Sequence, residues 1–508
     1  MQFLSKVMGD KLVLENARKE GLALTFDDVR LRTGYSEVLP DNVDVSSRFS
    51  RNVPLKIPLV SAAMDTVTEY KLAIELAKLG GIGVIHRNLS IEEQAFNVSK
   101  VKHHLNGLIQ KPICVFENDS IKSILYQAEE KKFEFRSFPV LDLQGKMVGL
   151  ITRNDFDFCD DFDCMAKDMM SRDLLIAPEN TTIDEAFFIM RDRKKKVLPL
   201  VDGQGNLVGM YAFSDVKRIK SDAVSSYNLD KKGRLRVAAA VGVGEDALKR
   251  VKALVEKDVD VIVMDTAHGD TKSVLETLKR IKSEFSVDVV VGNVSVGESA
   301  RRLAEAGADG IKVGQGGGSI CTTRIIAGIG RPQVSAIYDC SKAVEGYGIP
   351  ICADGGLRHS GDIPIALAAG AHSVMIGGML AGTEESPGEI VFFQGRKWKA
   401  YRGMGSLEAM QANKSSRERY LQSDGKKQVI PEGVEGLVPY KGSVSEVIFQ
   451  YVGGLRRGMG YVGASSIEEL RNKGEFDRIS GAGIQESHPH DILITKDSPN
   501  YSGSKNGT

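Results

Sequence analysis

The sequence shows no excess of either charge, because Lys plus Arg and Asp plus Glu both number 67 among 508 residues. This balance gives no indication of a nucleic-acid or membrane-surface partner. No apolar run approaches the ~20 residues that a membrane-spanning helix needs. The six cysteines are scattered without a CxxC pair, which argues against a zinc site or a disulfide framework and favours a reducing compartment. The N-terminal segment lacks an apolar signal core and the polar C-terminus lacks a targeting tripeptide, so we expect a cytoplasmic protein.

Glycine, by contrast, is abundant, and many of the 53 glycines stand where an apolar run gives way to a helical pattern. This happens in residues 259–270, 287–320 and 348–380, where Val/Ile-rich runs end in polar loops and helical patterns follow the latter two. The alternation predicts an α/β fold with parallel strands and right-handed crossovers. Polar loops after the strands are typical of a β/α barrel. A doubly wound sheet predicts the same local pattern.

The middle of the chain looks like two copies of one plan, in residues 111–170 and 171–220. FPVLDLQGKMVGLITRNDF in the first copy matches LPLVDGQGNLVGMYAFSDV in the second, and a repeat of ~50 residues indicates a paired module. The copies resemble a tandem of cystathionine-β-synthase-like (CBS) domains, which often bind adenine nucleotides. Asp155 and Asp215 suit either a ribose hydroxyl or a plain helix N-cap. We predict three parts: residues 1–110 as the first part of a catalytic barrel, 111–220 as tandem CBS domains, and 221–508 as the rest of the barrel with a mobile flap and a C-terminal segment.

The segment KVGQGGGSICTTR (312–324) carries the strongest chemical signal. Its glycines allow positive φ and close approach of the main chain to a ligand, and free N–H groups in such a loop suit phosphate. Cys321 stands in this polar loop, where a thiol is accessible as a nucleophile. A small core residue is the ordinary interpretation of a lone cysteine. That interpretation suits Cys114, Cys340 and Cys352, which stand in apolar runs expected to form strands or helices.

SICTTR after a glycine-rich turn resembles the catalytic loop of the inosine 5′-monophosphate (IMP) dehydrogenase / guanosine 5′-monophosphate (GMP) reductase family. Further motifs of that family follow in order and cover nearly the whole chain: LTFDDVRL (24–31), PLVSAAMDTVTE (58–69), GGIGVIHRNLS (80–90), DTAHGD (265–270), GNVSVGE (292–298), ADGGLRHSGDI (353–363), TEESPGE (383–389) and YRGMGSLEAM (401–410). The resemblance implies a (β/α)8 TIM barrel interrupted by an inserted tandem CBS (Bateman) module.

The resemblance also implies NAD-dependent oxidation of IMP to xanthosine 5′-monophosphate (XMP), a step of GMP biosynthesis, through a covalent thioimidate on Cys321. The implied catalytic residues are Cys321, Thr323, Arg419, Tyr420 and Glu432. Arg419 and Tyr420, on a polar flap (411–433), would hydrolyse the adduct. Arginine is a poor base at its ordinary pKa, so this role requires a special environment, and Thr323 with Glu432 is the alternative proton relay.

Binding residues follow from the same motifs. The implied substrate positions are Met64, Asn293, Ser319, Asp354, Gly356, Gly377, Gly378, Tyr401, Met404, Gly405 and Glu432. The implied NAD positions are Asp265, Thr266, Gly314 and Gly316. A K⁺ ion would be held by Gly316, Gly318 and Cys321 with Glu486, Ser487 and His488 of a neighbouring subunit, which implies a homotetramer or an octamer. The CBS pair implies adenine or guanine nucleotides as effectors. His268 has no implied role, and we expect a loop histidine satisfied by its neighbours.

Three features depart from the family pattern. Gln315 and Gly317 stand where bacterial dehydrogenases usually have an apolar residue and proline, which loosens the loop and bears on K⁺ binding. Gly377-Gly378 replaces a common Gly-Ser and is similar to the reductase branch. Ala62 stands where some relatives carry serine.

Two alternatives to the dehydrogenase stay open. One is an NADPH-dependent GMP reductase, which shares Cys321, Thr323 and Glu432. The other is a nucleotide-sensing protein built around the CBS pair on an inactive barrel. The pair Arg419-Tyr420 and the long flap favour the dehydrogenase.

Overall fold

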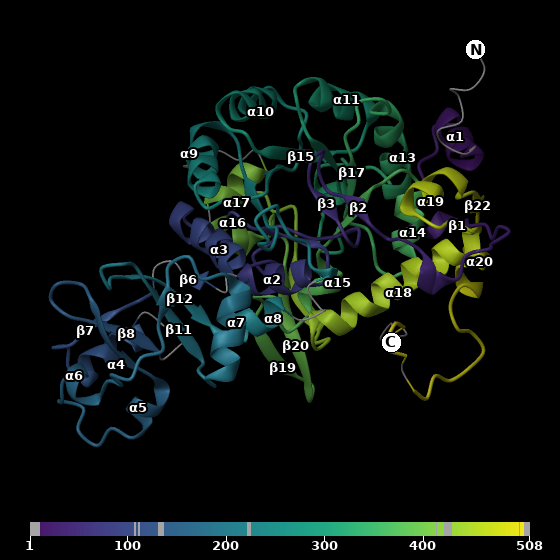
Figure 1. Cartoon of the computed structure of the whole chain (residues 1–508). Coiled ribbons are helices and arrows are strands. Elements are labelled where there is room, and N and C mark those ends of the chain that lie inside the picture. Colours follow the sequence, from purple (N-terminus) through teal and green to yellow (C-terminus); the bar gives the residue numbers. More distant parts are fainter. Residues whose placement is uncertain are drawn as a thin grey trace, which may run out of the picture. The chain divides into compact units, whose positions relative to one another are not determined.

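Eight parallel strands close into a barrel in the computed structural model (Figure 1). The structure describes residues 11–105, 108–109, 112–130, 137–220, 225–412, 414–420, 429–496 and 498–501. In ring order the strands are β13 (Ala238–Val241), β14 (Val261–Asp265), β15 (Asp288–Val294), β16 (Gly310–Val313), β17 (Ile351–Asp354), β18 (Ser373–Ile376), β4 (Leu59–Ser61) and β5 (Ile82–Ile85). The ring closes because β5 pairs with both β4 and β13. A doubly wound sheet would leave two open edges, so the predicted TIM barrel is confirmed.

The barrel strands are apolar throughout because both of their faces are covered. All seven residues of β15 and all four of β13 are buried, as expected of parallel strands between a packed interior and a layer of helices. Cys352 packs inside the barrel, and Cys340 is buried in α13 (Gln333–Ala343), so both are core residues as predicted. The same prediction was wrong for Cys114, which lies half-buried in a loop before β7 (Val115–Phe116).

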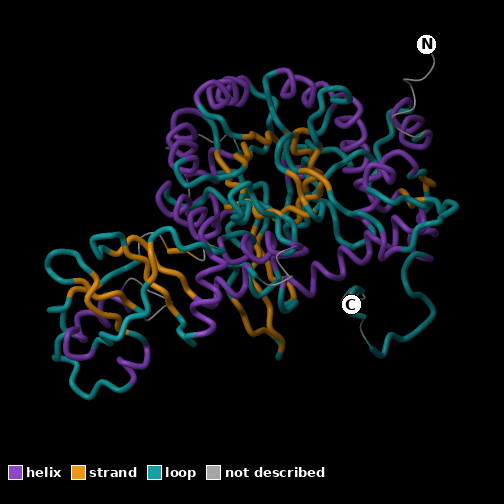
Figure 2. Tube along the Cα trace, in the orientation of Figure 1, coloured by secondary structure: helices purple, strands orange, loops and turns teal. Residues whose placement is uncertain are grey.

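Helices surround the ring of strands (Figure 2). In chain order they are α2 (Tyr70–Lys78), α3 (Ile91–His103), α9 (Gly244–Val255), α10 (Lys272–Glu284), α11 (Gly297–Glu305), α13 and α14 (Asp362–Ala368). Each turns an apolar face inward; in α11, Ala300 and Leu303 are buried whereas Arg301 and Arg302 are exposed. This pattern is the amphipathic periodicity of a helix that covers a sheet.

Additional elements extend the barrel unit. A three-stranded antiparallel sheet contains β19 (Ile390–Phe393), β20 (Arg396–Arg402) and β21 (Glu435–Pro439). Short helices α12 (Thr323–Ile326), α15 (Gly378–Ala381), α16 (Leu407–Ala412) and α17 (Lys414–Arg419) stand in the loops. The chain ends contribute α1 (Leu12–Lys19), β1 (Val29–Leu31), α18 (Val444–Val462), α19 (Ile467–Lys473), β22 (Phe476–Arg478) and α20 (Gly481–Glu486). Strands β2 (Ser47–Arg48) and β3 (Pro54–Leu55) form a separate small pair.

The chain divides into two compact units, one formed by residues 1–104 and 226–508 and the other by Leu105–Ser225. The second unit contains two halves with the same pairing. In the first half β7 runs parallel to β8 (Phe138–Leu141), which pairs antiparallel with β9 (Met147–Ile151) and shifts register after Val140. In the second half β10 (Ala177–Pro178) runs parallel to β11 (Val197–Val201), which pairs antiparallel with β12 (Leu207–Ala212) and shifts register after Leu200.

Helices follow the same order in both halves: α4 (Ile121–Glu130) and α5 (Arg153–Asp157) in the first, α7 (Ile183–Asp192) and α8 (Phe213–Ile219) in the second. A short α6 (Ala166–Met169) follows α5, and β6 (Leu108–Ile109) joins the sheet of the second half. The repeat is therefore present in three dimensions. Asp155 accepts hydrogen bonds from the N–H and the hydroxyl of Thr152, at 2.6 and 2.8 Å, so its carboxylate serves as part of a helix cap. Over the described ranges, no helix is long and apolar enough to cross a membrane.

Candidate functional site

A cavity of about 520 Å³ opens at the carboxyl ends of the barrel strands. All five predicted catalytic residues line it: Cys321, Thr323, Arg419, Tyr420 and Glu432. So do most of the predicted binding residues, namely Met64, Thr266, Asn293, Gly314, Gly316, Gly318, Asp354, Tyr401 and Met404. Residues more than 300 positions apart in the sequence thus meet in one place, because parallel strands present their carboxyl ends at the same mouth of a barrel.

Strand ends supply the polar wall of this cavity: Asn293 and Asp354 line it, and the buried Lys312 connects them to the buried Asp265. Lys312 on β16 is buried, and its ammonium group contacts Asp265 Oδ1 at 2.8 Å and Asp354 Oδ2 at 2.6 Å. The same ammonium group donates to Asn293 Oδ1, while Asn293 Nδ2 donates to Asp354 Oδ2 at 2.9 Å. The three donors of the lysine therefore match three acceptors. Lys312 links the predicted cofactor residue Asp265 to the predicted ribose residue Asp354.

The loop after β16 holds Cys321 at the cavity. The Cys321 N–H donates to Gly318 O at 3.0 Å, and its thiol donates to Thr323 Oγ1 at 3.2 Å. Thr322 N–H donates to Glu432 O at 3.0 Å, and Cys321 forms a β-bridge with Gly433. The nucleophile and the proposed alternative relay of Thr323 and Glu432 therefore share one hydrogen-bonded arrangement.

The structure requires glycine at some positions of this loop and not at others. A side chain at Gly314 would lie 2.0 Å from Asp354 O, and φ is positive at Gly314 and Gly316. At Gly317 φ lies outside the positive range and the nearest atom to an added Cβ is 3.6 Å away. The predicted loosening by Gly317 is therefore a matter of chain entropy, because no close approach requires glycine there.

Gln315 ties the same loop to two neighbouring strand ends. Its side-chain oxygen accepts from Ser295 Oγ at 2.6 Å, and its Nε2 donates to Ala267 O at 3.0 Å. His268, for which the sequence predicted no role, lines the cavity and lies 3.4 Å from the same Nε2. The Gln315 amide thus holds the loop by two hydrogen bonds, where an apolar residue would hold it by packing.

The predicted phosphate residues also gather together. A Cβ added at Gly378 would lie 3.2 Å from Ser319 Oγ, and one added at Gly377 would lie 3.1 Å from the Tyr401 hydroxyl. Burial raises the pKa of Tyr401 to about 12, against the opposing effect of a hydrogen bond with Ser319. The hydroxyl therefore stays protonated at neutral pH and is available as a donor. Gly356, with positive φ, lies next to the cysteine loop near Gly317.

The flap residues reach into the cavity from α17. The guanidinium of Arg419 forms an ion pair with Asp265, and its main-chain oxygen accepts from Ala267 N–H at 3.1 Å. Burial lowers the pKa of Arg419, with Tyr420 opposing the shift. Burial also raises the pKa of Tyr420, whose ring lies over Gly405 so closely that a Cβ there would be 2.6 Å from it. Residues 413 and 421–428 of the predicted flap lie outside the described residues.

Side-chain contacts hold α17 on the barrel. Asn88 accepts hydrogen bonds from the hydroxyls of Ser415 and Ser416, and its Nδ2 donates to Ser416 Oγ at 3.0 Å. Arg87, which is buried at the end of the β5 loop, pairs with Glu418 at 3.6 Å. These contacts were missed in the sequence because Arg87 and Asn88 belong to a motif that is more than 320 residues from the flap.

The predicted potassium residues fall into two separate groups. Gly316, Gly318 and Cys321 belong to the cysteine loop, whereas Glu486, Ser487 and His488 lie at the end of α20. Ser487 Oγ donates to Gly483 O at 2.7 Å, and the His488 ring lies 5.9 Å from that of His359. Over the described part of this single chain, no hydrogen bond joins the two groups.

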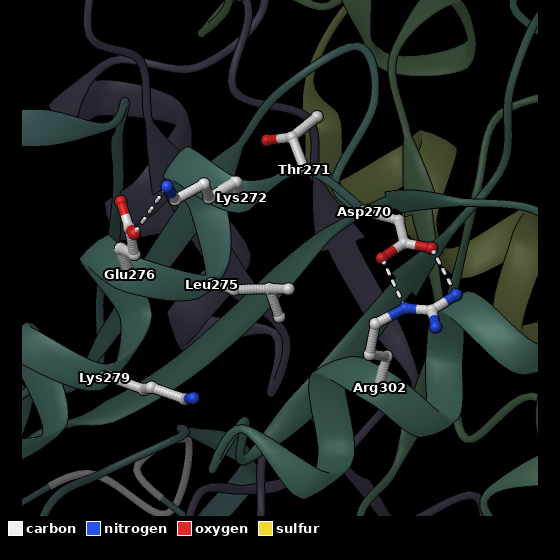
Figure 3. Close-up of a pocket in the computed structure, with 7 residues that line it drawn as sticks. All are labelled: Asp270, Thr271, Lys272, Leu275, Glu276, Lys279 and Arg302. Carbon is white, nitrogen blue, oxygen red and sulfur yellow. Dashed lines mark hydrogen bonds and ion pairs between the residues drawn. The ribbon is translucent and has the colours of Figure 1, made fainter.

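A second hollow lies beside the start of α10 (Figure 3). Two of the cations that line it form ion pairs: Arg302 Nε lies 2.9 Å from Asp270 Oδ1, and Lys272 Nζ lies 3.8 Å from Glu276 Oε1. The cations that would attract an anion are thus partly neutralised by carboxylates of the same chain. We assign no ligand to this hollow.

Comparison with known proteins agrees with this geometry. The model of the IMP dehydrogenase / GMP reductase domain matches residues 23–490. The chain belongs to this family. The inosine-5′-monophosphate dehydrogenase of Aquifex aeolicus (strain VF5) is 52% identical over 492 residues, which cover 96% of this chain and 99% of the relative. The corresponding enzyme of Bacillus subtilis (strain 168) is 48% identical over 489 residues, covering 95% and 98%.

A solved GMP reductase of Trypanosoma brucei in complex with guanosine 5′-monophosphate is also similar. It is 39% identical, with a TM-score of 0.84, and the match covers 93% of this chain and 98% of that one. Both branches of the family are therefore represented among its relatives. The residues of the cavity must decide between the two reactions.

Proposed function

We propose that this chain catalyses the NAD-dependent oxidation of IMP to XMP, in the formation of guanine nucleotides. The relatives named inosine-5′-monophosphate dehydrogenase are about 50% identical over nearly the full chain, against 39% for the GMP reductase. The observation that carries the proposal is the position of Arg419 and Tyr420 in the same cavity as Cys321. A dehydrogenase has an adduct to hydrolyse, and this pair is available to do so.

The chemistry begins at Cys321. Its thiolate would add to C2 of the purine of IMP, and bound NAD would supply the oxidation by accepting a hydride from C2. The product is a thioimidate between Cys321 and C2. Thr323 Oγ1 accepts from the thiol at 3.2 Å, and its hydroxyl could relay the thiol proton by passing on its own.

Hydrolysis requires a water at C2 and a group to take its proton. We assign this step to Arg419 and Tyr420, with Thr323 and Glu432 as the alternative relay. Burial lowers the pKa of Arg419, which moves the guanidinium toward the range where it exchanges a proton. Water addition expels Cys321 as the thiolate and releases XMP. The overall balance is IMP, NAD⁺ and water to XMP, NADH and a proton.

The residues fit a dinucleotide at the Asp265 side of the cavity. The carboxylate of Asp265 is the kind of acceptor that a ribose diol needs, and Thr266 beside it fixes the strand end by donating to Gly292 O at 2.7 Å. Arg419 contacts that same carboxylate. Arg419 and a cofactor ribose would therefore compete for Asp265, which would make hydride transfer and hydrolysis successive.

The substrate side would use the remaining predicted residues. Asp354 would accept from the ribose hydroxyls of IMP, while Ser319 and Tyr401, with the main chain at Gly356, Gly377 and Gly378, would hold its phosphate. Met64, Met404 and Gly405 would contact the purine. All these residues lie on or next to one cavity.

The test offers IMP with NAD⁺ and, separately, GMP with NADPH to the full-length protein. We expect NADH formation in the first mixture and no oxidation of NADPH in the second. Intact mass spectrometry of a reaction quenched during turnover should show a covalent nucleotide on Cys321. Turnover only with GMP and NADPH would instead establish the reductase reaction.

We also infer a K⁺ site made by the main-chain oxygens of Gly316, Gly318 and Cys321 together with Glu486, Ser487 and His488 of a neighbouring subunit in a homotetramer. Carbonyl and hydroxyl oxygens suit a weakly charged hard cation. Replacing K⁺ by Li⁺ should lower the turnover number, and light scattering should give the mass of four chains or eight. A monomer with full activity would refute this arrangement.

For Leu105–Ser225 we propose a tandem CBS module that binds adenine or guanine nucleotides. The repeated strand pairing of its two halves supports this assignment. Equilibrium dialysis with ATP and GTP tests it. Absence of binding to both would leave the module with a structural role only.

A further inference from the structure

Two cysteines outside the catalytic cavity lie next to each other. Cys159 follows α5 and Cys164 precedes α6, and their sulfur atoms are 4.0 Å apart. Both are free thiols, and both pack on the apolar cluster of the first half of the second unit. The four residues between them, Asp160–Asp163, are exposed. This pair was not predicted from the sequence, because its spacing is not that of a CxxC motif.

The surrounding hydrogen bonds fix this turn in a closed form. Cys159 Sγ donates to Asp161 O at 3.2 Å, and Cys164 N–H donates to the same oxygen at 3.3 Å. The turn is also tied to α4, because Ile121 N–H donates to Cys164 O at 3.0 Å. The two ends of the turn are therefore already held together before any covalent bond forms.

Disulfide geometry is within reach of these positions. Bonded sulfur atoms are about 2.0 Å apart, so each sulfur has to move by about 1 Å, which a small rotation of each side chain provides. Metal binding is a poor alternative explanation, since the described residues contain no group of three or more His, Cys, Asp or Glu side chains that could hold a metal ion.

We propose that Cys159 and Cys164 are a redox modification site that forms a reversible disulfide by exchange with a small disulfide molecule. The Cys164 thiolate, the more exposed of the two, attacks one sulfur of the reagent and releases one reagent thiol. The Cys159 thiolate then attacks Cys164 Sγ, forms the internal bond and releases the second thiol. The protein loses two protons and two electrons, and the reagent gains them.

The charge of the turn selects the reagent. Asp160, Asp161 and Asp163 stand between the two cysteines, and among the described residues only Asp163 of these three forms an ion pair, with Lys122 Nζ at 3.9 Å. A cationic disulfide such as cystamine is attracted to this turn, whereas anionic oxidised glutathione is repelled. We expect cystamine to react several-fold faster than oxidised glutathione. At high salt exposed charges are screened, so the ratio of these two rates should fall toward the ratio measured with free cysteine.

The experiment uses the full-length protein and trypsin, because both cysteines lie in the single peptide 154–167, between Arg153 and Lys167. The protein is treated with cystamine, remaining thiols are blocked with N-ethylmaleimide, and after digestion with trypsin the mass of peptide 154–167 is measured by mass spectrometry. We expect a peptide lighter by two hydrogen atoms that carries no maleimide, and full reversal by dithiothreitol. A peptide that carries two maleimides or two cysteamine groups after exhaustive treatment would overturn the proposal.

Matched variants identify the partners. In Cys159→Ser, Cys164 should stop at the mixed disulfide with one cysteamine group, and in Cys164→Ser the rate should fall. Cys114 lies in the same unit with no hydrogen bond to another thiol among the described residues, and should form only a mixed disulfide. If in Cys159→Ser the peptide 154–167 were instead recovered joined by a disulfide to another cysteine-containing peptide, another cysteine would be the partner and the pairing would be refuted.

Discussion

The wall of the cavity and the flap that closes it are built in different ways. Asp265, Lys312 and Asp354 stand on the barrel strands β14, β16 and β17, with β15 between the first two, and a buried ammonium group joins the two carboxylates. Arg419 stands at the end of a six-residue helix and forms an ion pair with Asp265. The rest of that helix is held by a hydrogen bond between Asn88 and Ser416 and by the ion pair of Glu418 with Arg87. The wall is part of the barrel core, whereas the flap rests on it.

This difference suits a reaction in two stages. The wall must keep its geometry throughout, and parallel strands with a satisfied buried charge do this. In the proposed mechanism the flap would leave Asp265 when a cofactor ribose is bound there and would return for hydrolysis. The described side-chain contacts of α17 are few, and because each contributes about 1 kcal/mol, they are compatible with the two positions that the proposed mechanism requires.

The largest effect is expected at the nucleophile, which both wall and flap serve. Cys321→Ala should lower turnover by ~10⁴-fold or more, because a nucleophile cannot be replaced by the residues that assist it. NADH formation and the covalent adduct measure this. Iodoacetamide at neutral pH should label Cys321 before Cys352, since burial raises the pKa of Cys352 to about 12. Cys114→Ala is the control and should keep full activity.

The flap is tested next by Arg419→Ala. We expect hydrolysis to slow by ~10²–10⁴-fold, the usual contribution of a positioned acid or base. Rapid-quench measurement should then show a burst of NADH with accumulation of the Cys321 adduct. The burst itself is the internal control, because hydride transfer does not need the flap. Equal slowing of the burst and of hydrolysis would assign Arg419 to binding.

The wall is tested by Lys312→Met. Removing one partner of a buried ion pair leaves uncompensated carboxylates and costs ~3–5 kcal/mol of folding free energy. We expect a lower melting temperature and weaker binding of both IMP and NAD. Lys102→Met is the matched control, because Lys102 is equally buried and lies 2.9 and 2.8 Å from Asp230 and Asp260, away from the cavity. It should lose stability while KM stays unchanged.

A smaller effect is expected when the flap contact at Asn88 is removed. Asn88→Ala should destabilise the position of the flap on Asp265 by about 1 kcal/mol, which lowers the ratio of this closed position to the open one roughly fivefold. The apparent KM for NAD should fall because Asp265 becomes more available, while the hydrolysis rate falls by a similar factor. Asn52→Ala, which removes a hydrogen bond to Asp288 Oδ1 of 2.8 Å, should change neither. A rise in both the apparent KM for NAD and the hydrolysis rate would contradict competition between Arg419 and the cofactor for Asp265.

The smallest effect is expected at Gly317 in the cysteine loop. Gly317→Pro should stabilise the loop by about 0.4–1 kcal/mol by restricting the unfolded chain, and should lower the K⁺ concentration needed for half-maximal activity. Scanning calorimetry and a K⁺ titration measure both. Gly317→Ala separates the effect of chain entropy from that of the proline ring, since the nearest atom to an added Cβ is 3.6 Å away. A lower melting temperature in both variants would show that the loop needs glycine.

Much of the site could be predicted because its motifs are local. The cysteine loop, the strand-end Asp265 and Asp354, and the Arg419-Tyr420 pair all stand in short segments with their own chemical signature. The structure brings all of them except Asp265 to the lining of one cavity, and Asp265 contacts Arg419. Lys312 could not be recognised, because within the run GIKV a lysine has no local partner. Gln315 was treated as a departure from the family pattern, and its two hydrogen bonds depend on strand ends that only the fold makes adjacent.

By itself the sequence determined the alternating strands and helices, the repeat in the middle and the cysteine loop, because periodicity, glycine placement and motif order act over short distances. Only the tertiary structure decided that the sheet closes into a barrel, since closure depends on pairing between β5 and β13, which are far apart in the chain. Only the tertiary structure placed Lys312 between two carboxylates, Arg419 on Asp265, and Cys159 beside Cys164. Barrel closure depends on main-chain pairing between distant strands, and the other three depend on side-chain contacts; the chain acquires both kinds of contact only when it folds.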